Sequence, residues 1–284
     1  MMQPNQSQEF HQKTVQASSL NALILDMDGV LWRGSQPIGN LPQIFARIQS
    51  NQWKVCLATN NATLTVAQYL DKLRSFGVSL KPEQIVNSSQ AAAHYLSHQH
   101  PEGGKVYVIG ENGLVDTLLE KGFTSVILTP DEANAKSGEI LAVVAGMDRT
   151  VTFNKLTVAT RLIRSGVPFI GTNPDRTFPT PIGLVPGAGA ILAALETATD
   201  VQPLICGKPS PEMYQVALER MGVDPEHTLV VGDRLETDIA GGQALRCLTA
   251  LVLSGVTTPE AASRWTPPPD WVAPDLETLI AGIS

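Results

Sequence analysis

Short apolar runs alternate with amphipathic segments along most of the chain. The apolar runs predict strands at residues 22–25, 54–58, 105–109, 125–128, 140–145, 167–171, 203–206, 228–231 and 248–253. The amphipathic segments predict helices at residues 40–53, 63–76, 91–97, 111–120, 153–164, 187–199, 211–221 and 275–280, with one more ending near Leu245. Strands that alternate with helices are typical of a parallel sheet, so the pattern predicts an α/β fold.

Three stretches depart from this alternation. Residues 129–139 (TPDEANAKSGE) are polar and predict a loop. Residues 171–187 (GTNPDRTFPTPIGLVPG) are dense in proline and glycine, which indicates either a long functional loop or a domain boundary. Residues 1–20 are polar, rich in glutamine and without the apolar segment of a secretory signal, so we expect a flexible tail there.

Polar residues follow four of the predicted strands. They are Asp26 with Asp28, Thr59 with Asn60, Lys208, and Asp233 with Asp238. The carboxyl ends of parallel strands meet at one edge of a sheet, so we expect the four groups to lie together there. Each group taken alone has a plainer explanation, as an acidic turn, a loop lysine or a helix start. Their order along the chain, each at the end of a strand, favours a shared site.

The spacing of these groups predicts how the chain divides. Asp26 and Thr59 are separated by about the length of one strand–helix–strand unit, and so are Lys208 and Asp233. The stretch between Thr59 and Lys208 is far too long for a single crossover connection. We therefore expect the middle of the chain to form a separate domain that is inserted into the first.

The acidic residues suit metal-assisted chemistry on phosphorus. A carboxylate such as that of Asp26 is a competent nucleophile toward phosphorus and can form an aspartyl-phosphate. Mg²⁺ takes oxygen ligands, commonly one or two carboxylates with the substrate phosphate and water, and Asp26 with Asp233 fits that count. Asp28, two residues beyond the nucleophile, would protonate the leaving oxygen and then activate water.

The other polar strand ends suit an anionic substrate. Lys208 would add a second positive charge to offset that of the phosphate. Thr59 and Asn60 would donate hydrogen bonds to the phosphoryl oxygens. The residue types at the four strand ends thus predict phosphoryl transfer at one site.

Four motifs, in this order, resemble the signature of the haloacid dehalogenase (HAD) superfamily of phosphatases: DMDGV (26–30), TNN (59–61), GKPSP (207–211) and GDRLETD (232–238). The further phrases VIGENGL, AGMDRTVTFNKL, FIGTNPD, VPGAGA and LVLSGVT are similar to the NagD / 4-nitrophenylphosphatase branch of subfamily IIA, which carries a C2a cap. The resemblance covers about residues 21–258. It implies a HAD-like Rossmannoid core with a parallel sheet, interrupted by an inserted α/β cap domain. We expect a core of residues 21–84 and 185–284 and a cap of residues 85–184.

The resemblance also implies roles for individual residues. Asp26 would be the nucleophile and Asp28 the general acid and base. The metal would be Mg²⁺, bound by Asp26 and Asp233, with Asp238 supporting the metal shell and Asp28 contributing its backbone carbonyl. The residues that would contact substrate are Thr59, Asn60, Asn61 and Lys208 at the phosphoryl group and Asn173 and Asp175 in the cap. A turn formed by Asn-Pro-Asp is the plainer explanation for that stretch of the cap.

Composition narrows the partners. The chain has 284 residues, of which 43% are hydrophobic and 17% charged, as in an ordinary globular protein. Its net charge of −7 argues against a nucleic-acid partner, and no apolar run has the roughly 20 residues of a membrane helix. The three cysteines fit neither a disulfide framework nor a zinc site, so we expect a cytoplasmic protein. The histidines, among them His94 and His98, are expected at surface or helix positions without a ligand spacing that competes with the carboxylates.

Motifs and chemistry together predict a Mg²⁺-dependent phosphatase that works through an aspartyl-phosphate. The expected substrates are phosphomonoesters of small metabolites (phosphoglycolate, sugar phosphates, pyridoxal phosphate or nucleoside monophosphates), with 4-nitrophenyl phosphate as a generic substrate. One alternative is a phosphotransferase or mutase, in which another acceptor replaces water. A second is a non-catalytic module that binds phosphorylated metabolites, which the intact set Asp26, Asp28, Lys208 and Asp233 disfavours. The resemblance also allows a homodimer joined through the caps, which no stretch of this chain specifies.

Overall fold

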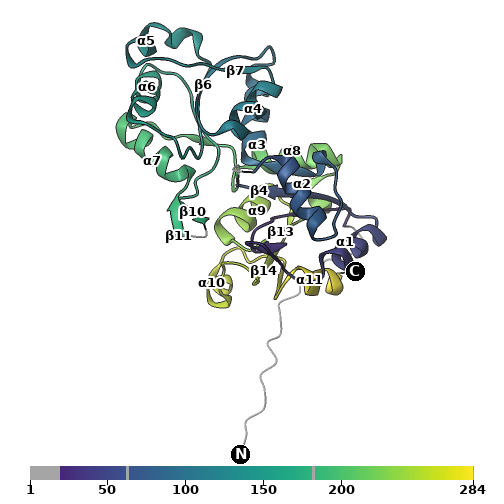
Figure 1. Ribbon diagram of the computed structural model, residues 1–284. Helices are drawn as coiled ribbons and strands as arrows, with labels where there is room; N and C mark the ends of the chain where they lie inside the picture. The colour runs from purple at the N-terminus through teal and green to yellow at the C-terminus, as the bar shows by residue number, and fades with distance from the viewer. Residues whose placement is uncertain (1–19, 62–63, 181–182, 284) are drawn as a thin grey trace, which may run out of the picture. The chain divides into compact units, whose positions relative to one another are not determined.

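A computed structural model describes residues 20–61, 64–180 and 183–283 (Figure 1). The tail predicted for residues 1–20 thus lies outside the described residues, apart from Leu20. The chain forms two compact units. Of the described residues, the first contains 20–57, 75–78 and 221–283, and the second contains 58–61, 64–74, 79–180 and 183–220. The predicted boundaries of core and cap fall at other places and stay a prediction.

A parallel sheet forms the centre of the first unit. Five neighbouring strands of this sheet stand in the order β15 (Trp271–Ala273), β14 (Leu248–Val252), β13 (Thr228–Gly232), β1 (Ala22–Leu25) and β4 (Lys54–Thr59). All four pairings are parallel. Every residue of β1 is buried, as expected of a central strand that is covered on both faces, and this explains its uninterrupted apolar sequence. The predicted α/β fold is therefore confirmed.

Helices and a short hairpin complete the first unit. They are α1 (Leu41–Ser50), α9 (Ala240–Ala244), α10 (Pro259–Arg264), α11 (Leu276–Ile283), the π-helical turn η5 (Leu235–Ile239), and the hairpin of β2 (Trp32–Arg33) and β3 (Gln36–Pro37). Helix α1 begins after Asn40, whose side chain accepts a hydrogen bond from the Gln43 N–H (3.2 Å). Its apolar face, which consists of Leu41, Ile44 and Ile48, is buried, and the helix packs against α11.

A second parallel sheet lies in the second unit. Its strands stand in the order β12 (Leu204–Ile205), β9 (Phe169–Gly171), β8 (Val143–Ala145), β6 (Gly104–Ile109) and β7 (Phe123–Ser125). All four pairings are again parallel. Strands β8 and β9 are fully buried, whereas β12 has only two residues and its Leu204 is 37% exposed.

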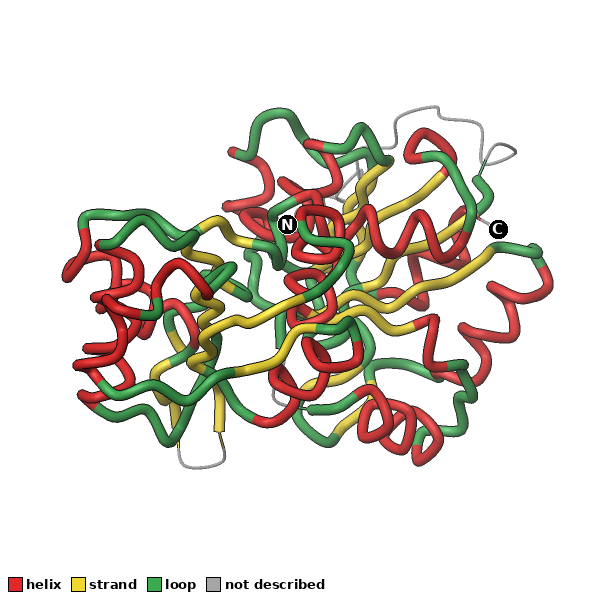
Figure 2. Tube along the Cα trace, turned by 90° about the horizontal axis from the view of Figure 1, so that it is seen from above, coloured by secondary structure: helices red, strands yellow, loops and turns green. Residues whose placement is uncertain are grey.

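Helices lie on either side of the strands, as Figure 2 shows in red and yellow. The remaining α-helices and strands of the described residues are α2 (Val66–Ser75), β5 (Ile85–Asn87), α3 (Ser88–Gln99), α4 (Asn112–Glu120), α5 (Pro130–Ala135), α6 (Phe153–Arg164), β10 (Thr177–Thr180), β11 (Gly183–Pro186), α7 (Ala188–Thr199) and α8 (Pro211–Met221). Side chains of α6 and α7 pack with those of β8 and β9 into one buried cluster, which includes Leu162, Phe169 and Leu195. This cluster is the core of the second unit.

Two predictions about loops are corrected. The segment 129–139 contains helix α5, because Thr129 and Glu132 form a capping box in which Oε2 of Glu132 accepts a hydrogen bond from the Thr129 N–H (3.0 Å). The segment 171–187 contains strands β10 and β11, which pair in antiparallel register. The predicted strand at 125–128 lies earlier, as β7, because Phe123 is the buried residue there. The predicted start of a helix at Thr63 lies outside the described residues, and α2 begins at Val66.

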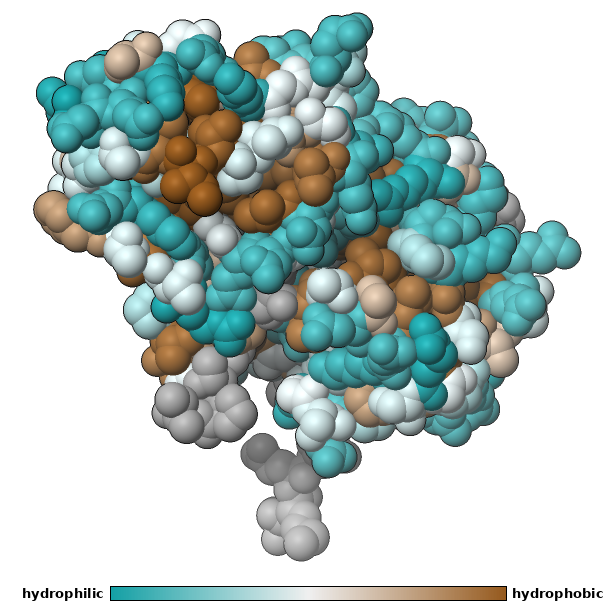
Figure 3. Space-filling model, turned by 45° about the horizontal axis from the view of Figure 1, so that its top comes forward, coloured by the Kyte–Doolittle hydropathy of each residue, from teal (hydrophilic) through white to brown (hydrophobic). Residues whose placement is uncertain are grey.

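Most of the apolar side chains are internal. Figure 3 shows hydrophilic side chains over much of one face, with apolar side chains gathered in separate patches. The large apolar side chains that are most exposed among the described residues are Ile127, Phe153, Leu184, Val256 and Leu119. None of the described helices has both the length and the apolar character that crossing a membrane requires.

The core of the second unit predicts a stability difference between two positions of one helix. Leu162 of α6 is fully buried, so we expect Leu162→Ala to lower the free energy of unfolding by about 2–5 kcal/mol through lost burial and a cavity. Phe153, the first residue of α6, is 84% exposed, and Phe153→Ala should change stability by less than about 0.5 kcal/mol. Urea unfolding followed by circular dichroism measures both, and equal effects would contradict this core.

Candidate active site

Three carboxylates of the first unit lie together at the carboxyl end of its sheet. Asp26 follows β1, Asp233 follows β13, and Asp238 lies in the turn η5. One carboxylate oxygen from each lies within 4.8 Å of the other two. The neighbouring strands place them there, since β1 and β13 pair in parallel with Leu25 opposite Val231. The structure thus brings together the three side chains that the sequence predicts for the metal shell, and we call them the carboxylate group.

Backbone on two sides encloses the side chain of Asp233, which is 1% exposed. Its Oδ2 accepts a hydrogen bond from the Val256 N–H (2.8 Å), and its carbonyl oxygen accepts one from Thr257 (3.2 Å). Gly29 lies so near that a Cβ there would come within 2.5 Å of Oδ2, and a Cβ on Gly255 would come closer still. Gly29 also has a φ of +86°, which L side chains rarely adopt. Glycine is therefore required at both positions.

Asp238 is equally buried, and the turn that carries it folds back onto the end of β13. Its Oδ2 accepts a hydrogen bond from the Arg234 N–H (3.1 Å). A Cβ on Gly232 would lie 2.0 Å from the Cβ of Asp238, so only glycine fits at the end of the strand. The motif GDRLETD thus supplies both buried carboxylates and the glycine that lets them approach.

Asp28 differs from these three residues because its side chain is exposed. Its Oδ1 accepts a hydrogen bond from Nε1 of Trp32 (2.8 Å), and the Trp32 side chain is fully buried. The next backbone carbonyl, that of Gly29, accepts a hydrogen bond from the Ser254 hydroxyl (2.7 Å), and Arg33 donates from Nε to the Ser254 carbonyl (2.6 Å). A rigid indole therefore fixes the direction of a carboxylate that faces solvent.

The carboxylate group fits a hard divalent cation. All three side chains offer oxygen, the ligand atom that Mg²⁺ and Ca²⁺ prefer. Carboxylates held this close repel one another, the more so because Asp233 and Asp238 are buried, and a cation offsets that repulsion. The donor set thus suits the divalent metal that the motifs predict.

A second polar group, in the second unit, is built around Asn60 and Lys208. The Lys208 N–H donates to Oδ1 of Asn60 (2.8 Å), and Nδ2 of Asn60 donates to the Lys208 carbonyl (3.0 Å). The Lys208 ammonium donates to the carbonyl of Ala58 (3.0 Å), and the residue is 3% exposed. Both polar atoms of the Asn60 side chain therefore hold the backbone of Lys208. We call these residues and their partners the lysine group.

The backbone of Asn60 is held in turn. Its carbonyl accepts hydrogen bonds from the Ser88 hydroxyl (2.8 Å) and from Nδ2 of Asn173 (2.9 Å), and both of these residues are buried. Thr59 accepts at Oγ1 from the Asn61 N–H (3.1 Å), which closes a tight turn after β4. Four of the predicted substrate residues, Thr59, Asn60, Asn61 and Asn173, thus lie in one network with Lys208.

Neighbouring strands explain how distant residues reach the lysine group. Strand β12 pairs with β9, so Gly207 follows one strand and Thr172 the other, and the Gly207 N–H donates to the Thr172 carbonyl (2.7 Å). A Cβ on Gly207 would lie 2.4 Å from that carbonyl oxygen and 2.7 Å from Oδ1 of Asn60. The expectation that the strand before Lys208 shares a sheet with β1 is therefore wrong. Its two residues are too few to carry a periodic signal, and they pair within the second sheet.

The cap residues predicted to contact substrate form a turn. Asn173 is 5% exposed, and its Oδ1 accepts a hydrogen bond from the Asp175 N–H (3.2 Å), the geometry of an Asx turn. The amide of Asn173 is directed at the Asn60 carbonyl, as described above. A contact between substrate and Asn173 or Asp175 stays a prediction.

Sequence reasoning missed several residues of these two groups. Ser88 directly follows strand β5, so the rule that polar residues gather at strand ends would have found it. From its place before an alanine-rich segment, Ser88 is instead expected to cap the helix. In the structure Asn87 is the cap, and its Oδ1 accepts a hydrogen bond from the Gln90 N–H (3.0 Å). Trp32 carries no local signal. Gly255 lies in the LVLSGVT phrase, but nothing in that phrase indicates its contact with Asp233, which only the fold creates.

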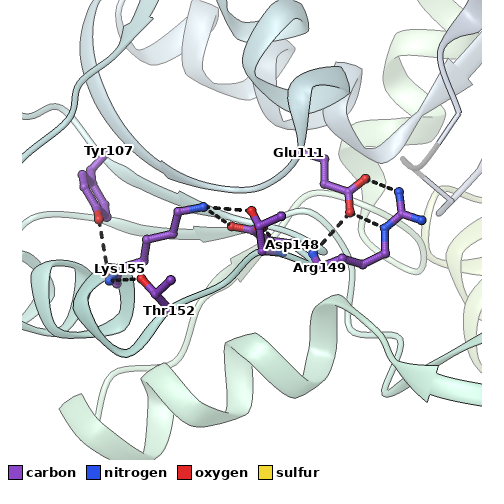
Figure 4. A network of polar contacts seen from close by, with 7 residues as sticks. Tyr107, Glu111, Asp148, Arg149, Thr152 and Lys155 are labelled. Carbon is purple, nitrogen blue, oxygen red and sulfur yellow. Dashed lines mark hydrogen bonds and ion pairs between the residues drawn. The ribbon is translucent and has the colours of Figure 1, made fainter.

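A charged network lies after two further strands of the second sheet (Figure 4). Glu111 follows β6, and Arg149 follows β8 by a few residues. Arg149 donates from Nε and Nη2 to the two carboxylate oxygens of Glu111 (2.6 and 2.7 Å). These hydrogen bonds hold the pKa of Glu111 below its ordinary value, although burial acts in the opposite direction. Glu111 is therefore a stable anion that fixes Arg149.

Asp148 extends the same network toward helix α6. It is 3% exposed, and its Oδ2 accepts from the ammonium of Lys155 (2.8 Å) while Oδ1 accepts from the Thr150 hydroxyl (2.7 Å). Burial raises the pKa of Asp148, but the hydrogen bonds from Lys155 and Thr150 outweigh it and leave the pKa lowered. Burial, followed by the nearby charge of Asp148, raises the pKa of Tyr107 to about 12. The AGMDRTVTFNKL phrase thus builds an ionised, tightly bonded corner of the second unit.

Comparison with known proteins places the chain in a family. The description "Haloacid dehalogenase-like hydrolase" matches residues 23–124, and "HAD-hydrolase-like" matches residues 205–279. An acid sugar phosphatase of Staphylococcus epidermidis is 35% identical over 260 residues, which are 92% of this chain and 96% of the relative. That of Staphylococcus aureus (strain USA300) is 36% identical with the same coverage.

Solved structures agree with this assignment. The p-nitrophenyl phosphatase from Archaeoglobus fulgidus has a TM-score of 0.83 at 32% identity and covers 93% of this chain and 99% of its own. NagD from E. coli K-12 has a TM-score of 0.81 at 29% identity, and the match covers 90% of this chain and 97% of NagD. The resemblance and the fold inferred from the four motifs are confirmed. The chain belongs to the haloacid dehalogenase-like hydrolases, as a phosphatase of their NagD-like branch.

Proposed function

We propose that this phosphatase hydrolyses phosphomonoesters of sugars, with Mg²⁺ as its metal and Asp26 as its nucleophile. The grouping of the carboxylate oxygens of Asp26, Asp233 and Asp238 within 4.8 Å carries the proposal, since it joins a nucleophile to two buried metal ligands. Among the expected substrate classes, sugar phosphates are favoured by the relatives named acid sugar phosphatase. A cytoplasmic location, a homodimer and the lack of nucleic-acid or membrane partners stay predictions.

The reaction has two displacement steps at phosphorus. In the first, a carboxylate oxygen of Asp26 forms a bond to phosphorus while the bond between phosphorus and the ester oxygen breaks, and Asp28 gives its proton to the leaving oxygen. In the second, Asp28 takes a proton from water, whose oxygen displaces Asp26 and releases inorganic phosphate. Asp28 suits proton transfer because it is exposed and because Trp32 fixes its direction through Oδ1, which assigns Oδ2 to the proton.

The metal would be held by the carboxylate group. Asp26 and Asp233 would supply side-chain oxygens, Asp238 would support the metal shell, and Asp28 would contribute its backbone carbonyl. When bound, Mg²⁺ offsets the repulsion between an anionic nucleophile and an anionic ester. The hydrogen bond from Val256 and the enclosing glycines support this role, because they hold Asp233 in place.

Lys208 and Thr59 would bind the phosphoryl group, as the motif match implies. The geometry supports a different role for Asn60, whose side chain has both polar atoms on the backbone of Lys208. We therefore assign Asn60 as a positioning residue that sets where the Lys208 ammonium stands. The alternative functions are phosphoryl transfer to another acceptor and binding without turnover. Both are disfavoured because the relatives compared are phosphatases. Binding without turnover is also disfavoured because the chain retains Asp26, Asp28, Lys208 and Asp233.

The nucleophile assignment predicts the effect of a minimal substitution. Asp26→Asn removes the attacking oxygen anion but keeps the shape of the side chain, so kcat for 4-nitrophenyl phosphate should fall by at least about 1,000-fold. Asp116→Asn, at an exposed position on α4, is the matched control and should leave kcat unchanged. If Asp26→Asn keeps a substantial fraction of wild-type activity, the nucleophile is another residue. Release of the phosphoryl group to added sugars rather than to water would instead indicate a transferase.

The metal assignment predicts dependence on a divalent ion. Chelation should abolish hydrolysis, and Mg²⁺ should restore it. Asp233→Asn should raise the Mg²⁺ concentration needed for half-maximal activity by at least about 10-fold, since it replaces a charged ligand with a neutral one. A Mg²⁺ titration of steady-state rates measures this shift. Activity that is indifferent to chelation would refute the assignment.

The positioning role of Asn60 predicts a loss of rate as well as of stability. Asn60→Ala removes both bonds to the Lys208 backbone, so kcat/KM for a sugar phosphate should fall by about 10–100-fold. Asn60→Asp keeps the acceptor for the Lys208 N–H but loses the donor to the Lys208 carbonyl. Its kcat/KM should therefore lie between that of the wild type and that of Asn60→Ala. If both variants lose stability in thermal unfolding but keep wild-type kcat/KM, Asn60 supports the fold alone.

A further inference from the structure

Two histidines and a glutamate come together outside the carboxylate and lysine groups. His94 and His98 are four residues apart on α3, so their side chains lie on the same face of the helix. Glu219 projects from α8, and its Oε2 lies 2.9 Å from Nε2 of His94. The two imidazole rings stand edge to face with centroids 4.2 Å apart. One ligand atom from each of the three residues lies within 4.8 Å of the other two.

The hydrogen bond at the far side of His98 prepares this ring to bind a metal. Nδ1 of His98 lies 3.2 Å from the backbone carbonyl of His94, an acceptor, so Nδ1 carries the proton. The lone pair is then on Nε2, the nitrogen free to act as a ligand. Metal-binding histidines commonly donate their other ring N–H to a carbonyl or carboxylate, which fixes both tautomer and ring orientation.

A simple hydrogen bond does not account for the whole arrangement. The contact between His94 and Glu219 alone would be a partly exposed pair of the kind that contributes little to stability. It does not involve His98, although one ring nitrogen of His98 also lies within 4.8 Å of the other two ligand atoms. A metal that takes Nε2 of both rings and one oxygen of Glu219 would use all three side chains. On metal binding, the proton of His94 would reside on Nδ1, and Glu219 would exchange its hydrogen bond for the metal.

The ligand set selects a class of ion. Two imidazole nitrogens and one carboxylate oxygen suit Zn²⁺ and similar transition-metal ions, whereas the all-oxygen carboxylate group suits Mg²⁺. Tetrahedral bonds of about 2.1 Å place ligand atoms about 3.4 Å apart, which the side chains reach with small rotamer changes. Glu219 has that freedom because its side chain is 59% exposed.

A cavity of about 240 Å³ borders this group. Its lining includes His94, Glu219, Thr117 and Glu120 but not His98, and the basic residue Lys121 also borders it. Arg220 also borders the cavity, and its guanidinium donates to the backbone carbonyl of Ile85 (2.8 Å). The cavity is large enough for water to complete a site with three protein ligands.

The geometry points to a second metal site, formed by His94, His98 and Glu219, for Zn²⁺ or a chemically similar transition-metal ion. The bound ion ties α3 to α8 within the second unit and stabilises that unit. This site is independent of the hydrolysis proposed for the carboxylate group. His94 and His98 stand on a helix, as expected. The proposal departs only from the expectation that their spacing does not compete with the carboxylates, because α3 continues through Gln99 and brings both to one face.

The test is metal binding by the full-length chain with Mg²⁺ in large excess, so that the carboxylate group is saturated. Titration with Co²⁺, followed by its visible absorption, and with Zn²⁺, followed by calorimetry, should give one equivalent bound with imidazole ligation. His94→Ala and His98→Ala should each weaken this binding by at least about 10-fold. Zn²⁺ should also raise the Tm of the wild type by a few degrees, but not that of His98→Ala.

Two control variants make the outcome decisive. His100→Ala changes a neighbouring histidine outside the group and should keep the bound equivalent. Asp233→Asn alters the carboxylate group and should also keep it. Because His98 is exposed, its replacement leaves the fold intact, which thermal unfolding without added metal verifies. The proposal is overturned if the wild type binds no such ion above Mg²⁺, if His94→Ala and His98→Ala bind it as the wild type does, or if Asp233→Asn abolishes the binding.

Discussion

Repulsion among the carboxylates of Asp26, Asp233 and Asp238 is the constraint on which the first unit depends. The order of strands forces it, because β1 and β13 are adjacent and both run directly into acidic residues. Backbone N–H groups from Val256 and Arg234 offset part of the charge, and a bound cation would offset the rest. The glycines of this region follow from the same constraint, since any side chain would fill the space that the charges occupy.

In the second unit, Asn60 has the corresponding central place. Its side chain holds Lys208, and its carbonyl receives Ser88 and Asn173, so one residue joins four segments of the chain. A single asparagine can do this because an amide offers donor and acceptor at the same distance from the backbone. Under the proposed function, a residue in the middle of the TNN motif would act on the reaction by placing a lysine.

The sequence predicts a residue of these groups where a pattern in its immediate neighbours, such as a buried strand before it, indicates its position. Asp26 and Asp233 each follow a strand of four or five buried residues, so the strand-end rule placed them correctly. The same rule failed for Lys208, because β12 has two residues and pairs with β9 in the other sheet. Helix α5 was missed although its capping box is visible in the sequence. The pairing of His94 with Glu219 was beyond local reading, because it depends on how two helices pack.

The backbone that encloses the Asp233 side chain has a consequence for the thermodynamics of metal binding. A side chain confined between Gly29 and Gly255, with one oxygen on the Val256 N–H, has few rotamers left to lose. Its conformational entropy is given up when the chain folds, so capture of an ion requires little further ordering at this position. Affinity at the carboxylate group is then governed by the removal of water from the incoming cation and much less by the ordering of the ligand that receives it.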